Sequence, residues 1–255
     1  MKITTWNING IRAIHKKGFF EYFEREQPDV LCVQETKADI SQISPEFHAP
    51  PGYEAFYHSC SVKKGYSGVA TFTKIKPEAT FKSFGIEKFD GEGRVMATDF
   101  GEFILFNVYF PNGGMNVGRL QYKLDFYDAF FAFCEQLRKQ GRKLVICGDY
   151  NTAHYAIDLA RPKENVLTSG FMLCERVKLD WLVEKKYHDT FRMFNQEGGN
   201  YTWWSQQQLS RPRNVGWRID YHWVTDDLTS KIINCTQQPA QEGSDHCPVV
   251  LEINV

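Results

Sequence analysis

The 255-residue sequence lacks any long apolar run. Its apolar stretches fall well short of the roughly 20 residues that a membrane-spanning helix needs, which argues against a membrane protein built on such helices. The first residues also lack the apolar core of a secretion signal and begin directly with a strand-like segment. We therefore expect a soluble protein of the cytoplasm that has no contact with membranes.

Paired cysteines are absent as well. The seven cysteines form no C-x-x-C pair, and Cys32, Cys147 and Cys247 lie in or beside apolar runs. This pattern is typical of buried, reduced thiols and argues against a disulfide framework or a cysteine-based zinc site. The chain also has no Pro/Gly/Ser-rich linker, low-complexity tract or fixed-period repeat, so residues 1–255 are predicted to form a single domain.

The sequence also lacks an excess of charge of one sign. Thirty Lys and Arg residues stand against 31 Asp and Glu residues, which gives a formal net charge of −1. The chain therefore carries no global basic signature of a nucleic-acid-binding protein. Any affinity for nucleic acid has to come from local groups.

Short apolar strands alternate with amphipathic helices along the chain. Apolar residues recur at three- and four-residue spacing over residues 18–27, 120–140 and 172–186, which predicts helices. Strands interleaved with helices predict a layered α/β domain, and neighbouring strands within 94–110 indicate mixed sheets. Strands are predicted at residues 2–8, 29–34, 53–59, 68–73, 94–99, 102–110, 144–148, 201–204, 218–224 and 248–254.

The stretch LVICGDYNTAH, residues 144–154, carries the main functional signal. Its first four residues form an apolar run that suits a strand buried on both faces, and Gly148 is expected to end that strand. Asp149 and Asn151 follow two residues apart, so both side chains leave the strand end on the same side. Active sites of layered α/β proteins often lie at such a place. A polar turn after a core strand is the simpler alternative.

Other polar residues also follow the ends of apolar runs. If the strands form two packed sheets, these ends could converge on one edge, and their oxygens are hard ligands that suit Mg²⁺ or Mn²⁺. Each residue alone is explained equally well as a strand-end cap or turn former, so the argument depends on the joint pattern. The residues are Asn7, Glu35, Tyr109, Asp149 with Asn151, and Asp245 with His246.

A catalytic role for His246 requires a carboxylate from elsewhere in the chain. Asp245 is adjacent in sequence, so in an extended segment the two side chains point apart. A catalytic imidazole normally has a carboxylate on its other nitrogen, and Asp220 in the segment RIDY is the candidate. A half-buried histidine in a turn is the alternative.

Six stretches resemble the successive motifs of the exonuclease III and apurinic/apyrimidinic endonuclease family: WNING, LCVQETK, VYFPN, GDYNTAH, GWRIDY and GSDHCP. That family belongs to the endonuclease/exonuclease/phosphatase superfamily of divalent-metal phosphoesterases. The motifs occur in the family's order, and KKGYSGVA, NVGWRIDY and YTWW narrow the resemblance to DNA repair. The resemblance implies a four-layered α/β sandwich, in which two mixed β-sheets pack face to face and helices flank them.

The resemblance also implies roles for individual residues. Glu35 would be the main metal carboxylate, and Asn9 would lie in the neighbouring shell. Tyr109 would contact the phosphate, and His246, paired to Asp220, would donate to a phosphate oxygen. The implied metal-site residues are Glu35, Asn7, Asp245, Asp149 and Asn151. Asp149 would activate or position the attacking water, and Asn151 would hold the phosphate beside it.

Two further sets of residues are implied to contact DNA. One set would bind the backbone, and the other would form the walls of a pocket for a flipped-out sugar without its base. The backbone set is Arg12, Lys16, Tyr66, Asn112 and Asn165. The pocket set is Trp203, Trp217 and Ile219.

The implied function is a Mg²⁺-dependent, monomeric repair endonuclease that hydrolyses the phosphodiester 5′ to an abasic site in duplex DNA. A 3′→5′ exonuclease or 3′-phosphodiesterase activity on blocked 3′ ends is expected beside it. The segment LARPKEN, residues 159–165, resembles relatives that also nick at deoxyuridine. The alternatives are a superfamily phosphoesterase acting on inositol phosphates, lipid head groups or RNA, and a non-catalytic DNA-binding module.

The sequence departs from some relatives at four places. Asn9 stands where some members have Asp, and Trp203 is bulkier than the Phe of others. The region 113–118 holds Met115 and Asn116 where an Arg inserts into the duplex in some members, and Gln207 stands where a Met wedge is found. These departures concern the grip on the duplex and the tightness of the sugar pocket rather than the chemistry.

Overall fold

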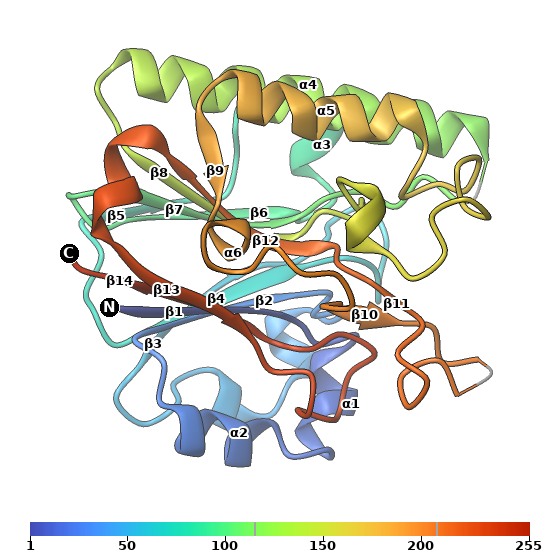
Figure 1. Ribbon diagram of the computed structural model, residues 1–255. Helices are drawn as coiled ribbons and strands as arrows, with labels where there is room; N and C mark the ends of the chain where they lie inside the picture. The colour runs from blue at the N-terminus through green and yellow to red at the C-terminus, as the bar shows by residue number, and fades with distance from the viewer. Residues whose placement is uncertain (115, 208) are drawn as a thin grey trace.

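The structure, a computed structural model, describes residues 1–114, 116–207 and 209–255. Two six-stranded sheets pack face to face, and helices cover the outer face of each sheet (Figure 1). This arrangement confirms the predicted four-layered α/β sandwich with mixed sheets. Among the helices that the structure describes, none combines the length and the apolar character that crossing a membrane would require.

The first sheet has the strand order β13-β14-β1-β2-β4-β3. Strands β1 and β2 run parallel, and the other neighbours run antiparallel. Its strands are β1 (Lys2–Asn7), β2 (Val30–Gln34), β3 (Glu54–His58), β4 (Val69–Thr73), β13 (Ile232–Gln237) and β14 (Val249–Ile253).

The second sheet has the order β5-β6-β7-β8-β12-β9, with β7 and β8 parallel. A separate two-stranded sheet of β10 and β11 carries three tryptophans, Trp203, Trp204 and Trp217. The strands are β5 (Ala79–Phe81), β6 (Val95–Asp99), β7 (Ile104–Tyr109), β8 (Leu144–Asp149), β9 (Tyr187–Asp189), β10 (Trp203–Trp204), β11 (Gly216–Trp217) and β12 (Asp220–Thr225).

The longer helices lie where the sequence predicts them. Helix α4 begins three residues before its predicted start, because the Asn116 side chain caps it by accepting from the Arg119 amide at 2.9 Å. The α-helices are α1 (Ile11–His15), α2 (Phe19–Glu26), α3 (Glu87–Asp90), α4 (Val117–Lys139), α5 (Leu173–Glu184) and α6 (Thr190–Phe194). The 3₁₀ helices are η1 (Ile40–Gln42), η2 (Pro45–Phe47), η3 (Ala156–Asp158) and η4 (Asp226–Lys231).

Three hydrophobic clusters hold the four layers together. In β8, Leu144 and Ile146 pack toward α4 and α5, whereas Val145 and Cys147 pack between the two sheets. The period-two alternation of a strand thus buries both of its faces, as the unbroken apolar run predicts. Helices α1 and α2 cover the outer face of the first sheet and pack against it through an aromatic cluster that includes Trp6.

Gly148 lies inside β8 rather than ending it, which corrects the prediction from sequence. Its φ of +135° is a conformation that favours glycine. A Cβ at this position would lie 1.9 Å from the Val108 carbonyl oxygen in the neighbouring strand. Glycine therefore lets β8 continue to Asp149 while two backbones approach closely.

Replacing Gly148 with alanine should destabilise the fold far more than the same change at Gly141. Both glycines have positive φ, but a Cβ at Gly141 meets no atom within 4 Å. We expect Gly141→Ala to cost about 1–2 kcal/mol from backbone strain alone. Gly148→Ala should exceed about 3 kcal/mol, because overpacking adds to the strain. Thermal and urea unfolding measure both, and equal losses would contradict the close approach.

Candidate active site

The topology brings six strand ends to one edge of the sandwich. The carboxyl ends of the parallel pairs β1–β2 and β7–β8 carry Asn7, Glu35, Tyr109 and Asp149. Strand β12 runs antiparallel to β8, so its first residue, Asp220, pairs directly with Asp149. Strand β14 runs antiparallel to β1, and the segment before it reaches the same edge.

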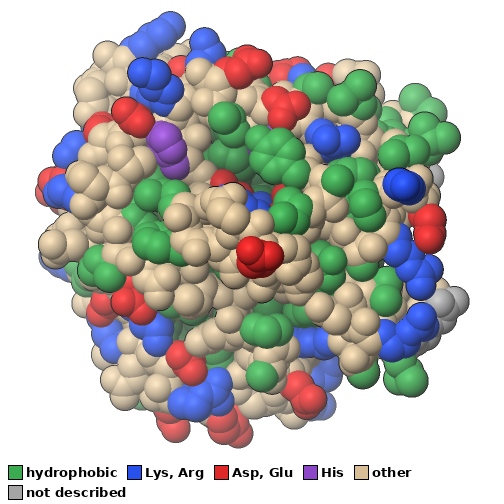
Figure 2. Space-filling model, in the orientation of Figure 1, with side chains coloured by type: hydrophobic (Ala, Val, Ile, Leu, Met, Phe, Trp, Pro, Cys, Tyr) green, Lys and Arg blue, Asp and Glu red, His purple; other side chains and the backbone are tan. Residues whose placement is uncertain are grey.

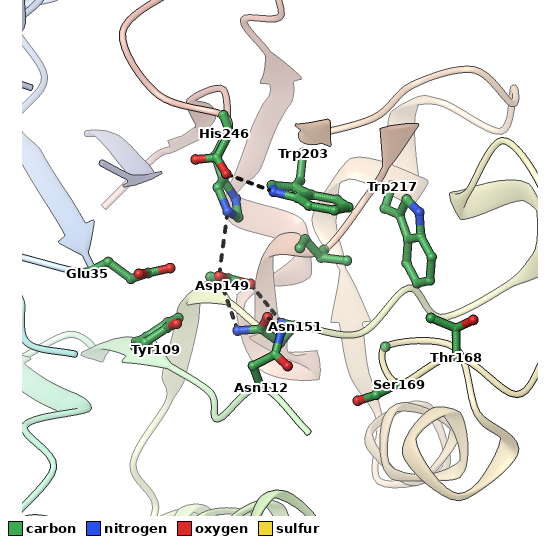
Figure 3. Close-up of a pocket in the computed structure, with 13 residues that line it drawn as sticks. Glu35, Tyr109, Asn112, Asp149, Asn151, Thr168, Ser169, Trp203, Trp217 and His246 are labelled. Carbon is green, nitrogen blue, oxygen red and sulfur yellow. Dashed lines mark hydrogen bonds and ion pairs between the residues drawn. The ribbon is translucent and has the colours of Figure 1, made fainter. Parts of the chain in front are cut away.

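A pocket of about 220 Å³ opens at this edge (Figure 3). Polar side chains from both sheets lie on one side of it, and tryptophans form the other side. It is lined by Glu35, Tyr109, Asn112, Asp149, Asn151, Thr168, Ser169, Gly170, Trp203, Trp217, Ile219, Asp245 and His246. Ten of these thirteen residues are site residues predicted from the sequence.

The buried Asn7 amide joins the two sheets at the pocket. Its Nδ2 donates to Glu35 Oε1 and to Asp149 Oδ2, both at 2.8 Å. Gln34, the residue before Glu35, donates from its side-chain amide to Asn107 Oδ1 at 2.7 Å, which is a second hydrogen bond between the two sheets. These buried amides fix the distance between a carboxylate of one sheet and a carboxylate of the other.

Glu35 is held ionised by its neighbours. Burial acts to raise the pKa of Glu35, but Lys37 and Asn7 together keep that pKa below its ordinary value. The Lys37 ammonium lies 2.6 Å from Glu35 Oε2 and also donates to Asn9 Oδ1. Lys37 follows Glu35 by two residues in the ETK segment but was not predicted as a site residue.

Glu35, Asp149 and His246 place ligand atoms within 4.8 Å of one another, close enough to hold a metal ion. Asp245 lines the same pocket, where its two oxygens accept from Asn9 Nδ2 at 2.8 Å and from Trp203 Nε1 at 3.1 Å. Carboxylate oxygens dominate this donor set, which fits a hard divalent cation.

His246 carries the carboxylate partner that the sequence predicts. Its Nδ1 lies 2.9 Å from Asp220 Oδ2, and the Thr202 hydroxyl donates to the same oxygen at 2.6 Å. Burial alone would lower the pKa of His246, but the charge and hydrogen bond of Asp220, together with the charges of Asp149 and Asp245, outweigh it and raise that pKa to about 10. The imidazole is therefore protonated at neutral pH, and its Nε2 faces Asp149 Oδ2 at 3.9 Å.

Asp149 has an unusual protonation equilibrium. Burial raises its pKa to about 7, against the opposing effect of the charged His246. A carboxylate with this pKa can take up and release a proton at neutral pH, as general acid–base catalysis requires. Desolvation likewise raises the pKa of Tyr109 well above its ordinary value, so its hydroxyl stays protonated and acts as a donor.

Asn151 is held in a fixed, strained conformation beside Asp149. Its φ is +50°, which is uncommon for a residue other than glycine. Its amide nitrogen Nδ2 donates to the Phe110 carbonyl at 2.9 Å, and its Oδ1 accepts from Asn112 Nδ2 at 2.9 Å. Strain of this kind concentrates at functional sites, where the surroundings sustain it.

The far side of the pocket is apolar. Trp203 and Trp217 stand nearly perpendicular to each other, with ring centres 6.3 Å apart. Both pack on a small cluster with Ile219. The three residues thus share one wall of the pocket, and the indole nitrogen of Trp203 donates to Asp245; their role toward a sugar stays a prediction.

The remaining predicted contact residues lie outside the pocket lining. Arg12 and Lys16 are exposed, and Asn165 donates to the Arg161 carbonyl. The Tyr66 hydroxyl accepts from two arginines. The DNA-contact roles of these residues stay predictions.

Figure 2 shows Lys and Arg interspersed with Asp and Glu on one face, in keeping with the net charge of −1. Met115 lies outside the described residues.

Three pocket residues were missed from the sequence: Thr168, Ser169 and Gly170. They follow a polar loop and carry no strand-end signal. Gly170 has a φ of +99°, and a Cβ there would lie 3.1 Å from the Trp217 ring. The sequence signal for this loop was Gly170 itself: a glycine can indicate that two segments approach closely, but it does not identify the second segment.

Comparison with known proteins gives consistent matches. The model of the Endonuclease/Exonuclease/phosphatase family matches residues 4–246. A DNA-(apurinic or apyrimidinic site) endonuclease of Dictyostelium discoideum is 42% identical over all of this chain and 71% of that protein. An exodeoxyribonuclease of Bacillus subtilis is 37% identical over the full length of both. The crystal structure of an AP endonuclease from Leishmania major matches with a TM-score of 0.90 at 30% identity, over 100% of this chain and 87% of that one.

Replacing Asp220 with asparagine should lower the pKa of His246 from about 10, because the carboxylate that opposes the effect of burial is gone. Ring-proton NMR of the metal-free protein follows this titration. Asp226→Asn is the control, since Asp226 pairs with the exposed His188 at 2.7 Å. An unchanged His246 titration in the Asp220→Asn protein would show that another group keeps it charged.

Proposed function

Because this chain belongs to the endonuclease/exonuclease/phosphatase family, we propose that it is a DNA repair nuclease that cuts the phosphodiester 5′ to an abasic site. The products would be a 3′-OH and a 5′ deoxyribose phosphate. The observation that carries the proposal is a single pocket in which Asp149 and the His246–Asp220 pair face an apolar tryptophan wall. The proposal includes action as a monomer in the cytoplasm.

The polar side of the pocket suits hydrolysis of a phosphodiester. Asp149, with a pKa of about 7, would take the proton of a water that attacks phosphorus. The P–O3′ bond breaks as the new P–O bond forms, and O3′ leaves to take up a proton. The imidazolium of His246 and the Tyr109 hydroxyl would donate to the non-bridging oxygens, where negative charge develops, and Asn151 would hold the phosphate beside Asp149.

Glu35 would hold a Mg²⁺ ion, or Mn²⁺ in its place, with Asn7, Asp149, Asn151 and Asp245 around it. Oxygen donors of this kind, and the convergence of Glu35 with Asp149, fit such an ion. When bound, the cation would stabilise negative charge on the phosphate and on the leaving oxygen. Lys37 already balances the single negative charge of Glu35 and so would compete with the cation for that carboxylate.

The apolar side of the pocket suits a sugar without its base. The volume of about 220 Å³ lies below the roughly 300–1,000 Å³ of ordinary ligand pockets. Extruding a nucleotide from a duplex is least costly where base pairing is already lost. A small cavity between Trp203 and Trp217 would therefore favour abasic nucleotides over intact ones.

A second activity on 3′ ends uses the same groups. A 3′→5′ exonuclease or 3′-phosphodiesterase presents a phosphodiester to the same catalytic residues, and the Bacillus subtilis relative is named an exodeoxyribonuclease. Nicking at deoxyuridine would require the pocket to admit a uracil base.

A cleavage assay on an abasic duplex, a blocked 3′ end and a uridine duplex separates these substrates. A soluble inositol phosphate, a lipid head group and an RNA test the rival phosphoesterases.

The Asp149→Asn protein should lose at least about 10²-fold in kcat on an abasic duplex while still binding it, because general acid–base help is worth roughly that much. EDTA should abolish cleavage by the wild type, and added Mg²⁺ should restore it. Asp128→Asn, an exposed carboxylate on α4, is the matched control. Cleavage that persists in EDTA rules out the metal, and full activity of Asp149→Asn rules out its catalytic role.

Trp203→Ala should weaken the preference for abasic over intact nucleotides by about 10-fold or more, the scale of one lost pocket contact. Trp181→Ala is the matched control, since Trp181 is also half-buried but stacks from α5 on Phe131 of α4. Cleavage of abasic and undamaged duplexes is measured beside thermal unfolding. A lower melting temperature with unaltered selectivity would make Trp203 a core residue rather than a wall of the site.

A further inference from the structure

A fully buried ion pair joins the two surface helices beside the pocket. Lys123 of α4 and Glu175 of α5 are each 0% exposed, and their Nζ and Oε1 atoms lie 2.6 Å apart. Charges are rarely buried this completely, because removal from water is costly unless every charge finds partners. The catalytic steps described above use neither residue.

The lysine reaches directly into the site. Besides Glu175, Lys123 Nζ donates to the backbone carbonyl of Asn151 at 2.7 Å. Asn151 has a φ of +50°, a backbone conformation that is uncommon for residues other than glycine, although asparagine tolerates it better than most. The ammonium of Lys123 supports this conformation from behind the pocket.

Glu175 binds the loop that forms the opposite wall of the pocket. Its carboxylate accepts from the Ser169 hydroxyl at 2.9 Å and from the Gly170 amide at 2.6 Å. Gly170 lies between the two halves of the site: a Cβ there would approach the Trp217 ring to 3.1 Å and the Asn151 carbonyl oxygen to 3.2 Å. The position of Gly170 therefore sets the spacing between Trp217 and Asn151.

We propose that Lys123 and Glu175 form a positioning pair that sets the distance between the phosphate-binding Asn151 and the sugar-binding wall. This proposal rests on the proposed nuclease function. One ammonium and one carboxylate connect both sides of the pocket to the rigid helices α4 and α5. Loss of either charge would leave the pocket present but misaligned, and small misplacements of reacting groups are costly in rate.

The test compares Lys123→Met, Lys123→Arg and Glu175→Gln with Lys178→Met. Lys178 also forms an α4–α5 ion pair, at 2.6 Å from Asp128, but that partner is 64% exposed. The measurements are kcat and KM on an abasic duplex with Mg²⁺, affinity for the same duplex in EDTA, and thermal unfolding. The wild type, assayed in parallel, tests the proposed function itself.

We expect Lys123→Met to lose about 10- to 100-fold in kcat, with duplex affinity in EDTA nearly unchanged. Lys123→Arg, which keeps the charge, should recover part of the loss, and Lys178→Met should match the wild type. If Lys123→Met does not fold, Glu175→Gln, which keeps the side-chain size, takes its place with the same expectation. These outcomes would support the positioning role.

Other outcomes overturn the proposal. If the folded variants keep the wild-type kcat, or lose no more than Lys178→Met, the pair only stabilises the fold. The same conclusion follows if neither Lys123→Met nor Glu175→Gln folds. A wild type that leaves the abasic duplex intact rejects the proposed function and the positioning role with it, whereas an active wild type with unaffected variants rejects the positioning role alone.

Discussion

The site depends on one buried side chain, the amide of Asn7. It donates one hydrogen bond to Glu35 in its own sheet and one to Asp149 in the facing sheet, both at 2.8 Å. The close-packed apolar interface resists sliding of one sheet over the other, and a buried amide adds specificity, because a shift in register would leave it without its partners. The Gln34–Asn107 bond at 2.7 Å reinforces this register just below the site. The apolar clusters hold the layers together, and these amides decide which atoms meet.

Backbone strain accompanies this register. Glu35, Lys37, Asn9 and Asn151 all have φ values between +48° and +56°. Each is a non-glycine residue in a conformation that costs of order 1–3 kcal/mol, so contacts around the site have to sustain it. Lys37 bonds Glu35 and Asn9, and Asn151 is bonded at its side chain and its carbonyl. The polar network therefore both supplies the chemistry and stabilises the backbone that presents it.

The sequence predicted most of the long elements and ten of the pocket residues, because strand ends carry a readable pattern. Asp220 was found from chemistry, since a charged imidazole needs a carboxylate. Gly148 was misjudged, because a residue with positive φ inside a strand depends on a neighbouring strand that no local pattern reveals. Strands β5, β9, β11 and β13 were missed: β5 and β9 have three residues each, β11 has two, and β13 is only partly buried. Thr168 and Ser169 were missed because tertiary contacts alone bring their loop to the pocket.

Three buried cations lie at or beside the pocket of this chain of net charge −1. His246 is an imidazolium in the pocket, Lys123 bonds the carbonyl of Asn151, and the Arg94 guanidinium lies 4.8 Å from the centre of the Tyr109 ring. All three are buried, so salt screens them far less than it screens surface lysines. His246 is paired with Asp220, Lys123 with Glu175 and Arg94 with Glu92. The pocket is also lined by the carboxylates of Glu35, Asp149 and Asp245. Attraction of a phosphodiester would therefore depend on a bound cation that balances these carboxylates, as well as on the buried imidazolium.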